Sequence, residues 1–194
     1  MARAPLEEPE GLAYHPALLT VAEEDKLLAV LAELRFDPIV MHGVAARRTA
    51  RHYGLDYDYE GRKPVPGEPM PGWLLELRER VAAFHAGEYV EALVQRYPAG
   101  STIGWHRDAP AFGDVVGVSL LGSARLRFQR GKGEERRVWE VLTEPRSVYL
   151  LSGPARTSWQ HSIPPTKELR YSITLRTLRK RSGAAASADS SSSS

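Results

Sequence analysis

The second half of the chain is a series of short runs of strand-forming residues, and this pattern constrains the fold more than any other feature. Six such runs cover residues 91–97, 115–121, 124–129, 138–142, 147–151 and 171–175. Turn-forming segments such as Arg130–Gly133 separate them. Many short strands with regular turns are typical of a β-barrel or a double-sheet jelly roll, so a mainly β fold is expected.

The first half carries two helical patterns. Thr20 and Glu23 form the pattern of a capping box, and the leucines between residues 27 and 34 then fall on one helical face. A second helix is expected to start near Pro71, because proline suits a first helical turn, and to bury apolar residues between 74 and 84. Since the helices precede the strands, we expect both to pack on one outer face of the β core.

Composition excludes several classes of protein. A chain of 194 residues suits one domain, and the net charge of +2 is too small to indicate a partner. Without cysteine the chain has neither disulfides nor thiolate metal sites, so a metal would need His, Asp or Glu. No secretion signal and no apolar run of membrane-spanning length is recognisable, so a cytoplasmic protein without a membrane partner is expected.

Two histidines and a carboxylate suggest a metal site. In an extended segment His106 and Asp108 point to the same side, and His161 supplies a second imidazole far downstream. This is the ligand set of the facial triad, which binds Fe(II) and leaves open positions on one side of the metal. Histidines with purely structural roles stay an alternative, because the chain also contains His15, His42, His52 and His85.

The segment from residue 169 to 176 alternates as a strand. Its polar face is made of Arg170, Ser172, Thr174 and Arg176. This face either meets water or lines a barrel interior, where buried arginines need an anionic partner such as a small dicarboxylate. The two arginines lie about 20 Å apart along an ideal strand. Either their side chains lean toward a shared site, or one acts through Asp108 or the metal region.

Four ordered motifs, taken together, resemble the AlkB family of Fe(II)- and 2-oxoglutarate-dependent dioxygenases. They are Gln-Arg-Tyr-Pro-Ala-Gly at 95–100, Gly-Trp-His-Arg-Asp at 104–108, His161, and Arg-Tyr-Ser-Ile-Thr-Leu-Arg at 170–176. The resemblance covers roughly residues 41–181, and the segment from Arg47 to Tyr59 is similar to the substrate-recognition segment of the family. It implies a double-stranded β-helix (jelly roll) with N-terminal helices and a substrate-recognition lid.

The resemblance also gives an expected organisation of the chain. A single dioxygenase domain would cover residues 1–181, with helices and lid in about 12–86 and the jelly-roll core in 87–181. The Ser/Ala-rich segment 182–194 cannot bury apolar surface and is expected to be a disordered tail. The protein is expected to be a monomer.

By position, the resemblance implies a role for each motif residue. The Fe(II) ligands and catalytic residues would be His106, Asp108 and His161. The residues that hold 2-oxoglutarate would be Tyr97, Arg170, Arg176, Gln95 and Ser172. Gln95 and Ser172 stand where family members often carry Asn, and both can still form hydrogen bonds. Dioxygen would be the other reactant.

The segment from Arg47 to Tyr59 interleaves cations with aromatic residues, which can neutralise phosphates and stack a base. The candidate substrate contacts are Arg48, Arg51, Tyr53 and Tyr57. A solvated loop with its tyrosines packed on the core is the alternative interpretation. Pro110 stands where repair members of the family carry an acidic residue, so the identity of the base stays open.

The expected function is oxidative removal of alkyl groups from nucleobases in single-stranded DNA or RNA. A related hydroxylase or demethylase that acts on modified tRNA or on protein is the alternative. A non-enzymatic jelly-roll binding module and a zinc hydrolase are two further hypotheses. Both leave Arg170 and Arg176 without a role.

Overall fold

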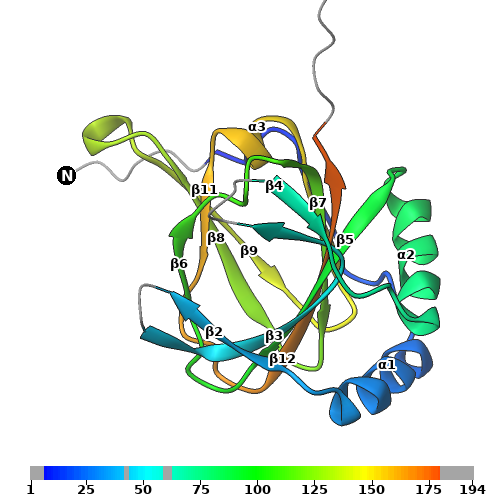
Figure 1. The fold of residues 1–194 in the computed structure, drawn as a ribbon. Helices are drawn as coiled ribbons and strands as arrows, with labels where there is room; N and C mark the ends of the chain where they lie inside the picture. Colours follow the sequence, from blue (N-terminus) through cyan, green and yellow to red (C-terminus); the bar gives the residue numbers. More distant parts are fainter. Residues whose placement is uncertain (1–6, 42–43, 59–62, 180–194) are drawn as a thin grey trace, which may run out of the picture.

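Two antiparallel sheets form the body of the protein, which a computed structural model describes for residues 7–41, 44–58 and 63–179. The large sheet has the order β1 (Leu12–His15), β10 (Val148–Leu151), β7 (Phe112–Leu120), β12 (Arg170–Leu178), β5 (Tyr89–Tyr97), β3 (Val44–Asp58) and β2 (Asp37–Met41), with β4 (Lys63–Pro66) paired to β3. The small sheet has the order β6 (Ile103–His106), β11 (Gln160–Ile163), β8 (Ala124–Arg130) and β9 (Arg137–Thr143). The two sheets face each other, as in a jelly roll (Figure 1).

The predicted mainly β jelly roll is confirmed. The six predicted runs correspond to β5, β7, β8, β9, β10 and β12. The short strands β1, β2, β6 and β11 were not predicted individually. Each has only four or five residues, which is too short for a clear alternation of apolar and polar side chains.

Helices α1 (Val21–Glu33) and α2 (Gly72–Phe84) pack against the outer face of the large sheet, as expected (Figure 1). Their apolar faces join one buried cluster with the outward-facing side chains of the central strands, among them Leu31, Leu74, Val81, Val94, Ile173 and Leu175. The predicted capping box is present, because Thr20 Oγ1 accepts a hydrogen bond from the Glu23 amide and Glu23 Oε2 accepts one from the Thr20 amide. Pro71 is the N-cap of α2, one residue before the helix begins.

A second buried cluster fills the space between the two sheets. It combines large-sheet residues such as Tyr97, Val115 and Leu151 with small-sheet residues such as Leu126 and Phe128. The central strands of the large sheet are therefore buried on both faces. One face is covered by helices and the other by the small sheet.

Glu24 joins α1 to the ends of two central strands. Its carboxylate is buried and accepts hydrogen bonds from the amide of Leu121 and from Nη1 of Arg146, both at 2.9 Å. Leu121 and Arg146 have φ angles of 68° and 67°, which side-chain-bearing residues adopt less readily than glycine. The helix thus stabilises two turns that follow β7 and precede β10.

Residues from both sides of position 87 build the large sheet, because β1 pairs with β10 and β3 pairs with β5. The division of the domain at this position stays a prediction. The short helix α3 (Gly153–Thr157) precedes β11, and a 3₁₀ turn, η1 (Gly133–Glu135), lies between β8 and β9. The predicted tail, residues 182–194, lies outside the described residues.

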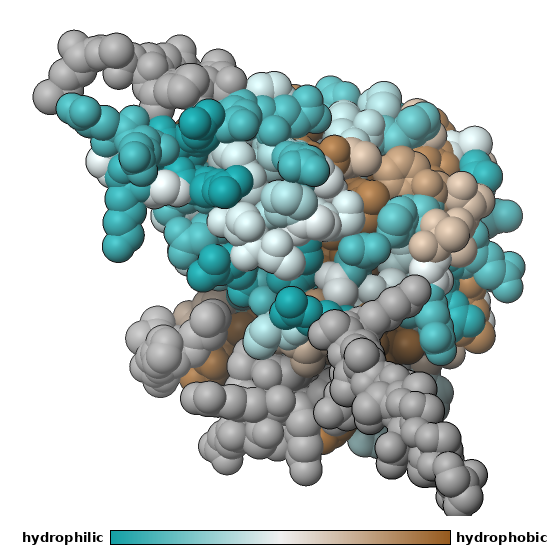
Figure 2. Space-filling view, turned by 90° about the horizontal axis from the view of Figure 1, so that it is seen from above, coloured by the Kyte–Doolittle hydropathy of each residue, from teal (hydrophilic) through white to brown (hydrophobic). Residues whose placement is uncertain are grey.

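The surface is mostly hydrophilic on the face seen from above, with hydrophobic residues gathered mainly to one side (Figure 2). Individual large apolar side chains such as Val21, Val40 and Leu142 are exposed, which is ordinary for a globular domain. Within the described ranges, no helix has both the length and the apolar character that crossing a membrane requires.

We expect Thr20→Ala to lower the free energy of unfolding by about 1 kcal/mol, because the first turn of α1 loses its capping hydroxyl. Urea denaturation followed by circular dichroism measures this change. Glu33→Ala, an exposed residue at the other end of the same helix, is the control and should stay within about 0.5 kcal/mol of the parent. Equal effects of the two substitutions would show that the cap contributes nothing specific.

Candidate active site

A pair of neighbouring strands in the small sheet brings the two predicted histidines together. His106 at the end of β6 and His161 in β11 are directly opposite each other in the antiparallel register. Their ring centroids are 4.2 Å apart. Residues far apart in the sequence thereby present two imidazoles to one point.

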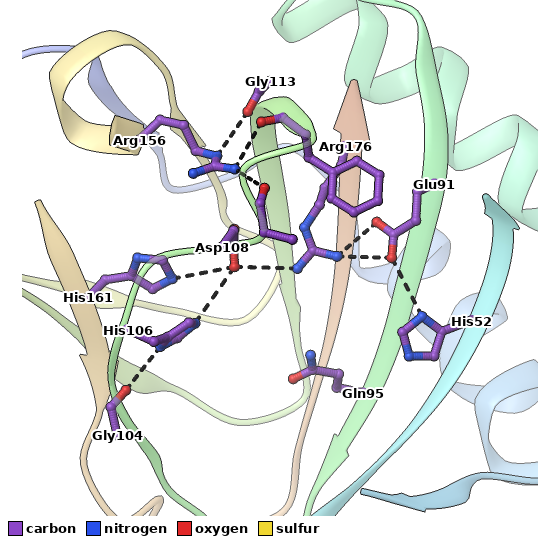
Figure 3. Close-up of polar contacts among 12 residues, drawn as sticks. His52, Glu91, Gln95, Gly104, His106, Asp108, Gly113, Arg156, His161 and Arg176 are labelled. Atoms are coloured by element: carbon purple, nitrogen blue, oxygen red, sulfur yellow. Dashed lines mark hydrogen bonds and ion pairs between the residues drawn. The ribbon is translucent and has the colours of Figure 1, made fainter. Parts of the chain in front are cut away.

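Asp108 completes the group from the loop that follows β6. Its Oδ1 lies 3.6 Å from Nε2 of His106 and 3.9 Å from Nε2 of His161 (Figure 3). One ligand atom from each of the three residues lies within 4.8 Å of the other two. The predicted metal-binding residues therefore converge, and two imidazoles with one carboxylate suit Fe(II).

The surroundings prepare both imidazoles to act as ligands. Nδ1 of His106 lies 2.9 Å from the carbonyl oxygen of Gly104, an arrangement in which the Nδ1 proton is donated and Nε2 stays free for a metal. Burial lowers the pKa of His161 to about 4, against the opposing effect of Asp108. His161 is therefore neutral at physiological pH, the state that metal ligation requires.

Asp108 is held in its anionic form. Burial alone would raise the pKa of this carboxyl, but the Arg176 guanidinium and the neighbouring histidines keep the pKa well below its usual range. Nη2 of Arg176 lies 3.6 Å from Oδ1 of Asp108 (Figure 3). The sequence allowed either a shared site for both arginines or an arginine that acts through Asp108, and the structure shows Arg176 beside Asp108.

Arg170 is a buried cation with unused hydrogen-bonding capacity. It is 1% exposed, its Nη2 donates to Ser119 Oγ at 2.8 Å, and its guanidinium carbon lies 5.1 Å from the ring centroid of Tyr97. Its Nε and Nη1 have no hydrogen-bond partner within the described part of the chain. Because an unpaired buried cation is costly, these two groups indicate a site for an anion.

All five residues predicted to hold the co-substrate lie on one side of two paired strands. Arg170 is opposite Tyr97, and Ser172 is opposite Gln95. The Tyr97 hydroxyl donates a hydrogen bond to Oε1 of Gln95. All four of these residues are buried, so the polar face of β12 lines the interior and does not meet water.

The geometry fits a metal ion and an anionic ligand with at least one carboxylate. Three converging ligand atoms lie at one end of the polar face of β12, and the unpaired Arg170 nitrogens lie at the other. Nε of Arg176 is also buried without a hydrogen-bond partner within the described residues. An elongated dicarboxylate could contact a metal ion at one end and the Arg170 guanidinium at the other.

Arg156 was not predicted to take part in this site. It is buried in α3 and donates hydrogen bonds to the carbonyl oxygens of Ala109, Phe112 and Gly113 at 2.7–2.9 Å (Figure 3). These contacts attach the loop after Asp108 to the segment that leads into His161. No sequence pattern marks this role, because the acceptors are backbone carbonyls.

Tyr149 was also missed. In the strand register it is opposite Gly117, where a Cβ atom would come within 2.2 Å of the Tyr149 ring. The glycine therefore leaves space for this ring. Burial raises the pKa of Tyr149 to about 12, so its hydroxyl is neutral, and the charges of Arg170 and Asp108 act on it.

The predicted substrate residues divide between the two faces of β3. Tyr53 is opposite Ala92 in the strand register and is buried in the cluster beneath the helices, with its ring 6.3 Å from that of Trp73. Arg51 lies on the same face and forms ion pairs with Glu68 and Asp37. The structure does not bring these two residues to the metal side, because neighbouring strand residues alternate between faces.

Arg48 and His52 occupy the other face of β3. His52 is opposite Leu93. Burial raises the pKa of the Tyr97 hydroxyl, and Arg48 lies near enough for its charge to oppose part of this rise. Both therefore lie on the side that carries the residues predicted to hold the co-substrate. Tyr57 belongs to β3, but its side chain is outside the described part of the structure.

We expect alanine at His106, Asp108 or His161 to abolish binding of Mn(II), a spectroscopic substitute for Fe(II), because each substitution removes one of three ligands. Electron paramagnetic resonance titration measures free Mn(II) directly. Asp114→Asn is a matched control, since Asp114 is a nearby carboxylate that pairs with His85 outside this group. Binding of wild-type strength by Asp108→Ala would place the metal elsewhere.

Comparison with known proteins agrees with this geometry. The family model of the 2OG-Fe(II) oxygenase superfamily matches residues 16–181. An Arabidopsis thaliana protein named alkylated DNA repair protein ALKBH8 homolog is 32% identical over 81% of this chain and 51% of its own length. Bovine DNA oxidative demethylase ALKBH2 is 30% identical over 63% of this chain and 49% of its own length.

The mouse tRNA (carboxymethyluridine(34)-5-O)-methyltransferase ALKBH8 is 25% identical over 82% of this chain and 25% of its own length. The chain thus spans about half the length, or less, of these relatives. Among solved structures, OsALKBH1 superposes with a TM-score of 0.64 at 16% identity, over 89% of this chain and all of that one. The chain belongs to the 2OG-Fe(II) oxygenase superfamily and is an AlkB-like member of it.

Proposed function

We propose that this AlkB-like oxygenase oxidatively removes alkyl groups from nucleobases in single-stranded DNA or RNA. The observation that carries the proposal is the position of Arg48 and His52, which project from β3 to the side of the predicted metal ligands. A cation and a half-exposed imidazole at this place suit a phosphate and a base. His106 is the most exposed of the three ligands, which favours approach of the substrate from its side.

In this proposal each part of the polar interior has a separate task. His106, Asp108 and His161 hold Fe(II), which supplies dioxygen activation when it is bound. Arg170 and Tyr97 would hold the distal carboxylate of 2-oxoglutarate, and Arg176 would lie toward its keto-acid end. In the proposed reaction, one oxygen atom of dioxygen would enter succinate as 2-oxoglutarate loses carbon dioxide, and the other would hydroxylate the alkyl carbon on a base nitrogen. The hydroxylated group then leaves as an aldehyde.

Burial of the polar face supports this division. The side chains of Asp108 and His161 are only 10% and 12% exposed, so little water reaches the reacting end of the co-substrate. Electrostatic interactions are stronger in such an environment than in water. An ion pair between the buried Arg170 guanidinium and a carboxylate would therefore be stronger than the same pair in water.

A modified tRNA or a protein is the second candidate substrate. Pro110, two residues after Asp108, offers no acidic group to an exocyclic amine, unlike the corresponding position in repair members of the family. One of the relatives described above, mouse ALKBH8, is named as a tRNA methyltransferase. Both observations favour a substrate other than the usual alkylated bases of DNA.

We expect Arg170→Ala to raise the KM for 2-oxoglutarate roughly a hundredfold, because loss of one partner of a buried charged pair costs about 3 kcal/mol. Arg170→Lys should also raise it, since an ammonium cannot form a two-pronged contact with a carboxylate. Succinate formation without added substrate measures the KM, and circular dichroism verifies the fold. Arg125→Ala, on the small sheet, is the control. An unchanged KM in Arg170→Ala would place the co-substrate elsewhere.

We expect Arg48→Ala to reduce the salt dependence of oligonucleotide binding by about one unit of slope, as loss of one phosphate contact does. Arg51→Ala is a matched control, because Arg51 lies on the opposite face of the same strand. Fluorescence anisotropy with a labelled single strand at several salt concentrations measures the slope. A reduced slope in Arg51→Ala alone would contradict the assignment of the two faces. No salt-dependent binding by the parent would favour the protein substrate.

A further inference from the structure

A buried carboxylate, Glu91, lies beside the predicted site and has no role in the function proposed above. It belongs to β5, is 1% exposed, and is directly opposite Arg176 in the register of β5 and β12. Burying a carboxylate without polar partners costs free energy, so the residues that contact Glu91 indicate its role. Glu91 contacts Arg176 on one side and His52 on the other (Figure 3).

The contact with Arg176 fixes the orientation of the guanidinium. Both carboxylate oxygens of Glu91 accept hydrogen bonds from Nη1 of Arg176, at 2.9 and 2.8 Å. Because a guanidinium is planar and rigid, holding Nη1 also determines where Nη2 points. Nη2 points to Oδ1 of Asp108, at 3.6 Å.

Charge gives the arrangement a second effect. Arg176 lies between the carboxylates of Glu91 and Asp108, so Glu91 offsets part of a positive charge that Asp108 would otherwise balance alone. Without that offset, the guanidinium would compete more strongly with a divalent cation for the Asp108 carboxylate. Burial lowers the pKa of Arg176, but the carboxylates of Glu91 and Asp108 outweigh this effect and raise the pKa above its usual value. The guanidinium is therefore permanently charged.

The contact with His52 connects Glu91 to β3, the strand that carries the proposed substrate residues. Nδ1 of His52 lies 3.7 Å from Oε1 of Glu91, and the imidazole is 44% exposed. Asp108, Arg176, Glu91 and His52 thus form a continuous line from a predicted metal ligand to β3 (Figure 3).

We propose that Glu91 is a positioning residue of the metal site: it aims Arg176 at Asp108 and offsets the arginine charge, so that Asp108 stays available to the metal. The proposal concerns metal binding and does not depend on the substrate. An ion pair that only joins β5 to β12 would contribute to stability and leave metal affinity unchanged.

A double-substitution cycle on Mn(II) affinity tests the proposal. Glu91→Gln, nearly the same shape without the charge, is expected to weaken Mn(II) binding about tenfold, the size usual for groups that support a metal ligand. In an Arg176→Gln background the same substitution should change the affinity less than twofold, because Glu91 would act through Arg176. Electron paramagnetic resonance titration without co-substrate gives each dissociation constant.

Two further variants complete the design. Glu140→Gln, which removes the carboxylate that pairs with Arg125 on the small sheet, should leave the Mn(II) dissociation constant unchanged. Glu91→Asp keeps the charge at a shorter reach, so it should weaken binding by less than Glu91→Gln. If Glu91→Gln does not fold, Glu91→Asp carries the test, and an unchanged constant in that variant overturns the proposal.

Two other results also overturn it. A folded Glu91→Gln variant with parental Mn(II) affinity and a lowered melting temperature would make the pair a link between strands only. Equal losses in the parent and Arg176→Gln backgrounds would show that Glu91 acts on the metal site without Arg176. Failure of oligonucleotide binding would leave this result untouched, because the titration contains no nucleic acid.

Discussion

The pairing of β5 with β12 determines which side chains face the interior of the protein. Its register gives each strand one apolar face toward the helices and one polar face toward the small sheet. The polar face would be unstable in a protein interior if its charges were unpaired. Arg176 contacts Glu91 and Asp108, whereas Nε and Nη1 of Arg170 have no hydrogen-bond partner among the residues that the structure describes. Stability and the requirement for an anionic ligand therefore arise from the same strand pair.

Much of this arrangement could be predicted from local pattern. The alternation between residues 169 and 176 placed Arg170, Ser172 and Arg176 on one face, and the structure keeps them there. The capping box of α1 and the six longer strands also followed from short-range spacing. Each of these features is determined by residues close together in the sequence, so the spacing within one segment is enough to predict it.

What the sequence did not reveal depends on contacts between distant segments. Glu91 becomes part of the site only because the register of β5 and β12 sets it opposite Arg176. Arg156 acts through backbone carbonyls, which no residue type encodes. In β3, the cations and tyrosines were grouped by composition, but strand alternation puts Arg51 and Tyr53 on one face, where Tyr53 is buried beneath the helices, and Arg48 on the opposite face. Composition shows which residues a segment contains, but which of them share a face depends on how the strand pairs with its neighbour.

The opposed histidines of β6 and β11 have a consequence for folding. β6 is an edge strand of the small sheet and β11 is its neighbour; each is four residues long, and their register is interrupted between His161 and Ile163. A metal held by His106, Asp108 and His161 would link chain segments that are far apart in sequence, and so would reduce the freedom of the unfolded chain. The ion would therefore stabilise the pairing of β6 with β11 as well as take part in the reaction. The stability of the fold would then depend on the concentration of free metal.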